Sequence, residues 1–222
     1  MRQFGVDGLT DKAVLFTGPG IAQLPVEERM TVCNMGIEMG AMIACFGDEA
    51  KEEGVAASIP LDLTLLEPMA ACPFSPANVR PVAELGDISV TQVVVGSCTN
   101  GRLNDMEKVV NVLRSHKVHP DVNCLIIPAS KQVLDAMEER GWTKILRDAG
   151  AVVANPGCGP CFGAHQGLGT ERDTIVTTTN RNFPGRMGHR AAKLYLASPA
   201  TAAETAVVGK ITQPGTLQRE VG

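Results

Sequence analysis

Three cysteines follow apolar segments at positions where their thiols could hold a metal centre. Two residues separate Cys158 and Cys161 in the turn NPGCGPC. Such a pair can bind one metal centre or form one disulfide, and Gly159 and Pro160 favour a tight turn with both sulfurs on one side. Cys98 follows a second apolar segment, in GSCTNGR. The three thiols together predict a ligand set.

Three chemistries remain open for this set. A thioredoxin-like redox pair would have an aromatic residue before Cys158 and a long helix after Cys161, and the sequence offers neither. A structural zinc site would need a fourth ligand, for which His165 is the nearest candidate. An iron–sulfur cluster held by three thiolates would leave one iron open to bind a substrate hydroxyl and carboxylate. We favour the cluster.

Two arginines lie in the loop NRNFPGR, which follows the apolar segment TIVTTT. The planar guanidinium groups of Arg181 and Arg186 match a carboxylate in two parallel hydrogen bonds. Proline and glycine restrict the backbone of this loop. We therefore interpret the two arginines as a binding site for a carboxylate substrate.

Composition limits the class of protein. The chain has 222 residues, a net charge of -4, a pI near 5.6 and few aromatic residues, so it lacks the basic surface and stacking groups of a nucleic-acid binder. No apolar run reaches the roughly 18 residues of a membrane span, and the first residues lack a signal-peptide core. We expect a soluble, cytoplasmic protein without membrane contact.

The seven cysteines are odd in number and irregularly spaced, which argues for a reducing compartment rather than a secreted disulfide framework. Cys33, Cys45 and Cys124 lie in apolar runs and are expected to be small buried hydrophobes. Cys72 precedes a proline in a turn-rich segment and has no expected role.

The second part of the chain, 87–222, alternates between strand and helix patterns. The expected strands are 88–97, 123–128, 151–154, 174–179 and KLYLASP, and the expected helices are 103–117, 131–149 and PATAAETAVVGKI. Such alternation predicts an α/β domain with a parallel sheet, in which ligands bind beyond the carboxyl ends of the strands. The three cysteines and the arginine loop follow strands, so we expect them to converge.

The first part, 1–86, is interpreted as a partial α/β domain with its boundary near Gly86. The segment 24–47 predicts a largely buried helix that begins at Pro25. Asn34 and Glu38 are four residues apart and share one face of it, either as a solvated stripe or as part of a site. The dense prolines that follow predict an extended connection, since they exclude continuous helix and central strand.

GSCTNGR, CGPC and NRNFPGR, in this order and at these separations, resemble aconitase-type hydro-lyases. The segments MTVCNMGIEMGA, CPFSPANVRPV and GRMGHRAAKLYLASPATAAETAVVGKIT most resemble large subunits of 3-isopropylmalate dehydratase, or of the similar homoaconitase. The resemblance covers essentially the whole chain. It implies aconitase-type α/β domains, with this chain forming part of the second domain and all of the third.

The resemblance also implies a reaction and roles for residues. The implied reaction is isomerisation of a 2-hydroxy di- or tricarboxylic acid by dehydration and rehydration, as in leucine biosynthesis, or of the substrate of another aconitase-type hydratase. The implied site has the 4Fe–4S ligands Cys98, Cys158 and Cys161, the substrate-binding residues Asn34, Arg181 and Arg186, the cluster neighbours Ser97 and Asn180, and the catalytic residue Glu38.

The sequence departs from the family pattern at its beginning. Its large subunits begin with a long α/β domain ahead of the MTVCNM helix, and residues 1–30 do not resemble it. The resemblance therefore implies two partners, one supplying that domain and a small subunit carrying the catalytic serine. We expect no turnover by this chain alone. The alternative is a truncated, non-catalytic scaffold or regulatory descendant.

Overall fold

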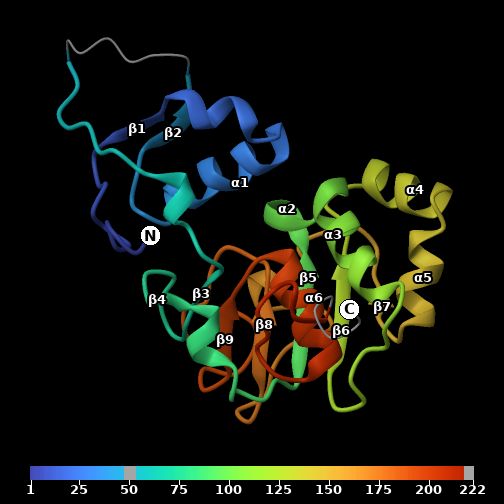
Figure 1. Cartoon of the computed structure of the whole chain (residues 1–222). Coiled ribbons are helices and arrows are strands. Elements are labelled where there is room, and N and C mark those ends of the chain that lie inside the picture. The colour runs from blue at the N-terminus through green and yellow to red at the C-terminus, as the bar shows by residue number, and fades with distance from the viewer. Residues whose placement is uncertain (48–53, 218–222) are drawn as a thin grey trace. The chain divides into compact units, whose positions relative to one another are not determined.

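The computed structural model describes residues 1–47 and 54–217 (Figure 1). The chain forms two compact units, Met1–Glu67 and Pro68–Gly222. This division lies before the boundary near Gly86 that the sequence predicts. The reason is that part of the proline-rich segment contributes strands β3 (Met69–Ala71) and β4 (Val79–Pro81) to the sheet of the second unit.

The first unit contains a parallel pair of short strands and one helix. Its elements are β1 (Ala13–Phe16), η1 (Pro19–Gln23), α1 (Val26–Ile37), β2 (Ile43–Phe46) and η2 (Leu63–Leu65). Strands β1 and β2 pair in register from Ala13 opposite Ile43. Leu9, Met39 and Ala41 form a small core.

The long helix predicted over 24–47 is wrong in its extent. α1 begins directly after Pro25, as predicted, but it ends at Ile37, and Gly40 adopts the left-handed φ of 84° that commonly follows a helix end. The apolar run after it forms β2 instead, because a short apolar run fits a strand as well as a helix. The helix is also less buried than predicted, since Val26 and Met30 are exposed.

The second unit follows the predicted alternation closely. Its remaining elements are η3 (Val82–Leu85), β5 (Gln92–Gly96), α2 (Ser97–Asn100), α3 (Leu103–Leu113), β6 (Asn123–Ile127), α4 (Lys131–Glu139), α5 (Trp142–Asp148), β7 (Val152–Val153), η4 (Gly159–Phe162), β8 (Thr174–Thr177), β9 (Lys193–Leu196) and α6 (Pro199–Val208). Each strand and helix expected in this unit has its counterpart.

The strands of this unit form one sheet in the order β4-β3-β9-β8-β5-β6-β7. Strands β5 to β9 pair in parallel, whereas β3 and β4 form an antiparallel edge. The predicted α/β class with a mainly parallel sheet is confirmed. From β5 the chain moves outward to β6 and β7, and then returns to the other side of β5 as β8 and β9. The order therefore reverses between β5 and β8, which is where ligands bind in sheets of this kind.

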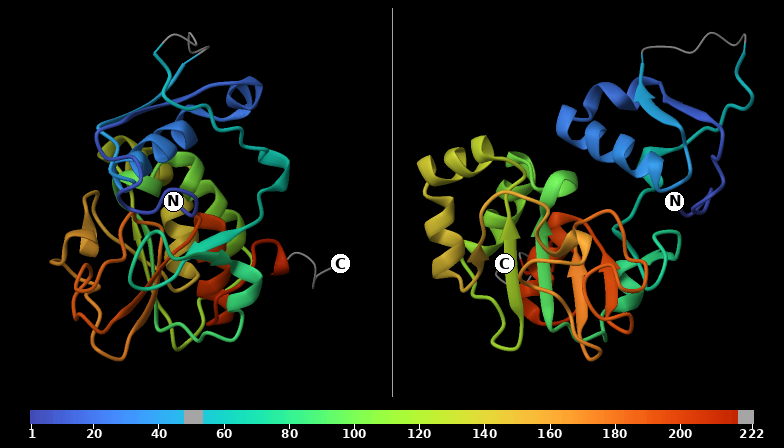
Figure 2. Two further views of the ribbon diagram at one scale, coloured as in Figure 1. Left: turned by 90° about the vertical axis from the view of Figure 1, so that its left-hand side faces the viewer. Right: turned by 180° about the vertical axis from the view of Figure 1, so that it is seen from behind.

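The two faces of the sheet are covered differently. Val93 and Val95 pack on one face in a core with residues of α3, α4, α5 and α6, whereas Val94 between them points to the other face. That second face is covered by loop residues, including Cys161 and Met187. The left view of Figure 2 shows the helices and the loops on opposite sides of the sheet. The loop-covered face thus carries one of the predicted ligands.

No helix in residues 1–47 and 54–217 combines the length and the apolar character that a membrane crossing requires.

Candidate metal centre

The predicted ligands meet where β5 and β7 end, at what we call the carboxyl edge of the sheet. Cys98 is the second residue after β5, and Cys158 and Cys161 follow β7. Burial raises the pKa of Cys161, the neighbouring Arg186 opposes this rise, and the nearby Cys98 and Cys158 add to it. The structure therefore places Cys98, Cys158 and the predicted Arg186 in the neighbourhood of Cys161.

The turn that presents Cys98 has an unusual backbone. Gly96 has φ 119°, and a Cβ on this residue would lie 1.9 Å from the carbonyl oxygen of Ile127, so only glycine fits. Ser97 adopts φ 71°, which is rare for a residue with a side chain. Its Oγ is buried and has no hydrogen-bond partner among the described residues. Strain of this kind is typical of functional sites.

The other two thiols lie in a short, tight turn. η4 begins at Gly159, whose φ is 54° and whose added Cβ would lie 2.0 Å from Cδ1 of Ile127. The turn leaves Cys158 exposed and buries Cys161. Between Phe162 and β8 the chain is fully described and contains no helix. The long helix expected of a thioredoxin-like redox pair is thus missing.

The arginine loop follows β8 and reaches the same thiols. Nη2 of Arg186 lies 3.9 Å from Sγ of Cys161, and Oδ1 of Asn180 lies 4.0 Å from the same sulfur. Nε of Arg186 is buried without a hydrogen-bond partner in the described part of the chain. Arg181 belongs to the same loop and is half-buried. The loop therefore offers a half-buried arginine, with a buried and unsatisfied Nε, beside the predicted ligand Cys161.

Sequence reasoning missed Asn182, which holds this loop to the sheet. Its side chain is fully buried, and Nδ2 lies 2.8 Å from the carbonyl oxygen of Cys72 and 3.2 Å from that of Leu194. Cys72 lies 110 residues from Asn182 in the sequence, and Leu194 belongs to another element, β9. The one signal in the sequence was the position of Asn182 in the arginine loop. Asn182 fixes the base of the loop that carries Arg181 and Arg186.

Asn34 and Glu38 belong to the first unit. Asn34 is half-buried on α1, and Glu38 caps the carboxyl end of that helix and is only 7% exposed. Glu38 is therefore not part of a solvated stripe, which was one of the two predicted alternatives. The participation of these two residues in the site remains a prediction, because the structure describes the first unit by itself.

The remaining cysteines differ from their expected burial in two cases. Cys124 is buried as predicted, and burial raises its pKa to about 12. Cys45 is exposed and Cys33 is half-buried, so the prediction of buried hydrophobes is wrong for these two. Both belong to the first unit, which has the smaller core.

Thiolates are the usual ligands of iron–sulfur clusters, and the donor set includes three thiols. Among the described residues, no group of three or more His, Cys, Asp or Glu side chains could hold one metal ion. A structural zinc site needs four ligands around one point. In a cubane cluster each thiolate binds a different iron, so the sulfurs need not converge on one point. The three thiols and the buried, unpartnered atoms of Ser97 and Arg186 beside them are consistent with such a group.

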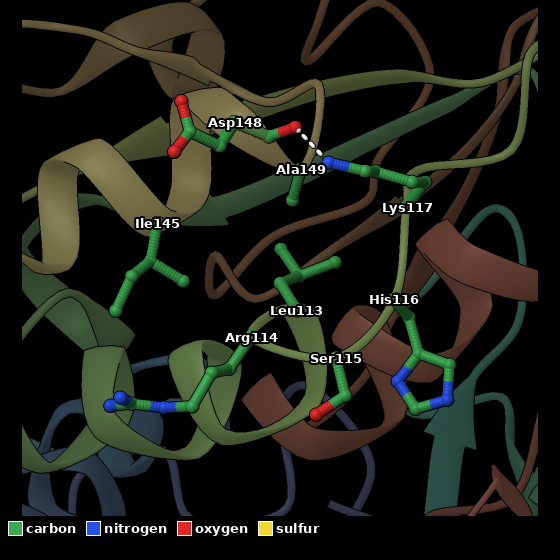
Figure 3. Close-up of a pocket in the computed structure, with 8 residues that line it drawn as sticks. All are labelled: Leu113, Arg114, Ser115, His116, Lys117, Ile145, Asp148 and Ala149. Carbon is green, nitrogen blue, oxygen red and sulfur yellow. Dashed lines mark hydrogen bonds between the residues drawn. The ribbon is translucent and has the colours of Figure 1, made fainter.

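A cavity of about 300 Å³ lies elsewhere, at the amino ends of β6 and β7 (Figure 3). We call the side of the sheet at which the parallel strands begin the amino edge. Its wall is formed by Leu113, Arg114, Ser115, His116, Lys117, Ile145, Asp148 and Ala149. Lys117 Nζ donates a hydrogen bond of 2.6 Å to the Asp148 carbonyl oxygen across it. None of the predicted site residues lines this cavity.

Comparison with known proteins agrees with this geometry. The model of the "Aconitase family (aconitate hydratase)" matches residues 1–54 and 78–209. The chain belongs to the aconitase family. The family resemblance predicted from its motifs is confirmed. The expectation that residues 1–30 do not resemble the family is wrong, because the match includes them.

Among curated relatives, the 3-isopropylmalate dehydratase large subunit 1 of Methanopyrus kandleri is 43% identical over 96% of this chain. The 3-isopropylmalate dehydratase large subunits of Acetivibrio thermocellus and Clostridium kluyveri are each 42% identical, over 96% and 95% of the chain. These alignments cover only 55–56% of each relative. The chain thus spans little more than half the length of these relatives.

Proposed function

We propose that this chain is the cluster-bearing part of an iron–sulfur hydro-lyase of the 3-isopropylmalate dehydratase type. The observation that carries the proposal is the meeting of Cys98, Cys158, Cys161 and Arg186 at the carboxyl edge. This edge is also where the strand order reverses, at which sheets of this kind bind ligands. The names of the relatives support 3-isopropylmalate as substrate. Homocitrate and citrate are the alternatives that the resemblance to other aconitase-type hydratases implies.

The three cysteines would hold a 4Fe–4S cluster. When bound, this group supplies an iron without a protein ligand, a Lewis acid for the departing hydroxyl. The half-buried position of the thiols, with Cys161 inside and Cys98 and Cys158 exposed, would leave one side of the site open to substrate.

Arg186 would bind a substrate carboxylate. A buried N–H group without an acceptor is costly, and Nε of Arg186 is such a group. A carboxylate oxygen would satisfy it with a charge-assisted hydrogen bond. Arg181, five residues earlier in the same loop, would bind the second carboxylate of the diacid.

Four further residues complete the proposed chemistry. The amide of Asn180 and the unpartnered hydroxyl of Ser97 would lie against the cluster. Asn34 would orient the substrate, and Glu38 would serve one proton transfer. The dehydration also needs a base for the proton on the adjacent carbon. We propose that a small subunit supplies that base as a serine, and that the remaining part of a large subunit supplies further walls of the site.

Anaerobic reconstitution tests the cluster assignment. The protein should become brown and bind four irons and four sulfides, while Cys98→Ser, Cys158→Ser and Cys161→Ser should each abolish this binding. Cys124→Ser is the matched control, because Cys124 is buried in the sheet away from the carboxyl edge. A cluster that survives Cys98→Ser would overturn the assignment.

A second measurement tests the reaction. Isomerisation of isopropylmalate, homocitrate and citrate should be followed with the reconstituted chain alone, and then with a small subunit and the missing part of a large subunit added. We expect turnover only in the complete assembly. Turnover by the chain alone would refute the need for partners, and a cluster without turnover in any assembly would favour a non-catalytic role.

A further inference from the structure

One residue joins the turn that carries Cys98 to the loop that carries the arginines. Thr178 directly follows β8 and is fully buried. Its backbone N–H donates to the carbonyl oxygen of Val94 at 3.0 Å, and its Oγ1 accepts from the N–H of Gly96 at 2.8 Å. Its carbonyl oxygen accepts from Nδ2 of Asn100 at 2.8 Å. All three bonds lead to the segment 94–100, which encloses Cys98.

These hydrogen bonds lie at the end of the ladder between β5 and β8. The ladder between β5 and β8 ends with Val94 opposite Thr177, and the order of strands reverses between these two strands. Beyond this point β5 continues to Gly96 paired only with β6, and β8 ends at Thr177. The bonds from Gly96 and Asn100 continue the contact between the two segments past the end of the ladder. They therefore tie two segments that the strands themselves no longer hold.

The bonds also lie close to both groups of functional residues. Asn100 is two residues from Cys98, and Thr178 is two residues from Asn180 and three from Arg181. The acceptor for Gly96 is a buried side chain, so loss of this acceptor would leave a buried N–H unsatisfied. A shift of the cysteine turn would thus be transmitted to the arginine loop through two hydrogen bonds.

We propose that Asn100 and Thr178 are positioning residues that make the Cys98 turn and the arginine loop move as one body. The cluster part of this inference rests on the proposed function. When the cluster leaves, the turn loses a ligand bond and the arginine loop loosens with it. By linkage, a loosened loop releases the cluster faster. Asn100 and Thr178 are not among the proposed cluster ligands or substrate-binding residues.

The structure offers a matched control for Thr178. Thr205 on α6 is equally buried, and its Oγ1 also accepts from a backbone N–H, that of Thr212, at 3.1 Å. Thr212 follows Ile211, whose backbone N–H donates a hydrogen bond to the carbonyl oxygen of Ile88 ahead of β5. The hydrogen bond between Thr212 and Thr205 therefore lies near the amino edge. Thr178→Val and Thr205→Val remove the same kind of hydrogen bond without changing side-chain shape, and they differ only in location.

The first experiment measures amide hydrogen exchange of residues 179–186 in the full, cluster-free chain. Thr178→Val and Asn100→Ala should each speed this exchange by about fivefold, which corresponds to the roughly 1 kcal/mol of one net hydrogen bond. Asn100→Asp keeps the shape but loses the donor, and should behave like Asn100→Ala. Thr205→Val should lower the melting temperature as Thr178→Val does, but leave this exchange unchanged. Unchanged exchange in Asn100→Ala, or equal exchange in the two valine variants, would overturn the proposal.

The second experiment follows the absorbance of the reconstituted cluster after addition of an iron chelator under anaerobic conditions. We expect about fivefold faster bleaching in Asn100→Ala and Thr178→Val, and wild-type bleaching in Thr205→Val. If the wild-type chain binds no cluster, the proposed function fails, while the exchange experiment still decides whether the two segments are tied. If the cluster binds and bleaches at the same rate in all variants, the tie fails and the proposed function stands.

Discussion

The two edges of the sheet differ in how well their polar groups are satisfied. In the described part of the chain, four buried side-chain atoms have no hydrogen-bond partner, and they belong to Ser97, Asn104, Asn182 and Arg186. These residues lie in the segments that follow β5 and β8, the two strands between which the order reverses. At the amino edge, by contrast, the carboxylate of Asp173 accepts three hydrogen bonds.

This difference shows where the fold serves function rather than stability. Buried polar atoms are normally paired, because leaving them unpaired costs free energy. The amino edge follows this rule and the carboxyl edge departs from it, with additional strain at Ser97. Departures of this kind cluster at ligand sites, where a bound group supplies the missing partners. The same sheet therefore has one edge whose polar groups are satisfied within the chain and one edge that carries the proposed ligand site.

The largest expected difference between the edges concerns two arginines. In the complete assembly, Arg186→Ala should lower kcat/KM by roughly 30- to 4,000-fold, since truncating one partner of a buried charge pair costs about 2–5 kcal/mol. Arg114→Ala, in the cavity at the amino edge, should leave kcat/KM unchanged. Arg186→Lys should restore only part, because an ammonium group lacks the planar fork. Equal kinetics of the two alanine variants would remove the functional distinction between the edges.

The second difference concerns two glycines that both have a positive φ. Gly96 has φ 119° and Gly150, at the amino edge, has φ 101°. An added Cβ would clash with backbone at Gly96 but would lie 3.6 Å from the Val118 side chain at Gly150. We expect Gly150→Ala to cost about 1–2 kcal/mol of unfolding free energy from backbone strain alone, and Gly96→Ala to cost about 2 kcal/mol more. Urea denaturation measures both, and equal costs would show that the clash at Gly96 relaxes freely.

The third prediction tests whether the amino edge is stabilised by its satisfied carboxylate. Burial alone would raise the pKa of Asp173, but hydrogen bonds from Thr170 and Thr91 outweigh it and lower that pKa. Asp173→Asn should therefore reduce the unfolding free energy at pH 7 by about 1 kcal/mol. The depressed pKa means that this stabilisation is present above the unfolded-state pKa of about 4 and is lost as the pH falls through the folded-state pKa. Urea denaturation at pH 7 and pH 3 should show the difference between the two proteins shrinking at pH 3; a constant difference would contradict the assignment to the charged form.

The smallest effect is expected for the exposed ion pair beside the cavity. Lys144 and Asp148 are both largely exposed, and their hydrogen bond lowers the pKa of Asp148. Solvent and salt screen such pairs, so Lys144→Ala should leave the melting temperature unchanged. A clear fall in melting temperature would show that the amino edge depends on surface charge as well as on the bonds of Asp173.

The sequence by itself determined the local structure of the second unit and the family of the chain. Alternating strand and helix patterns of ordinary length predicted its elements, and three motifs with rare residue types indicated the family and the candidate ligands and arginines. Prediction failed in the first unit, where the apolar run after Ile37 fits a strand as well as a helix and where the left-handed Gly40 decides between them. Local patterns are informative when each segment has one favourable conformation.

Only the tertiary structure decided which segments meet. Gly96 and Asn100 bind Thr178, and Asn182 binds the carbonyl oxygen of Cys72, across 82, 78 and 110 residues of sequence. The order of the strands brings these partners together. No local sequence pattern predicts which single residues will form these hydrogen bonds. The sequence could therefore indicate the residues proposed to touch the cluster and substrate. The residues that hold those side chains in place became visible only in the structure, where β5 and β8 are neighbours. The reason is that a hydrogen bond depends on distance in space and not on separation along the chain.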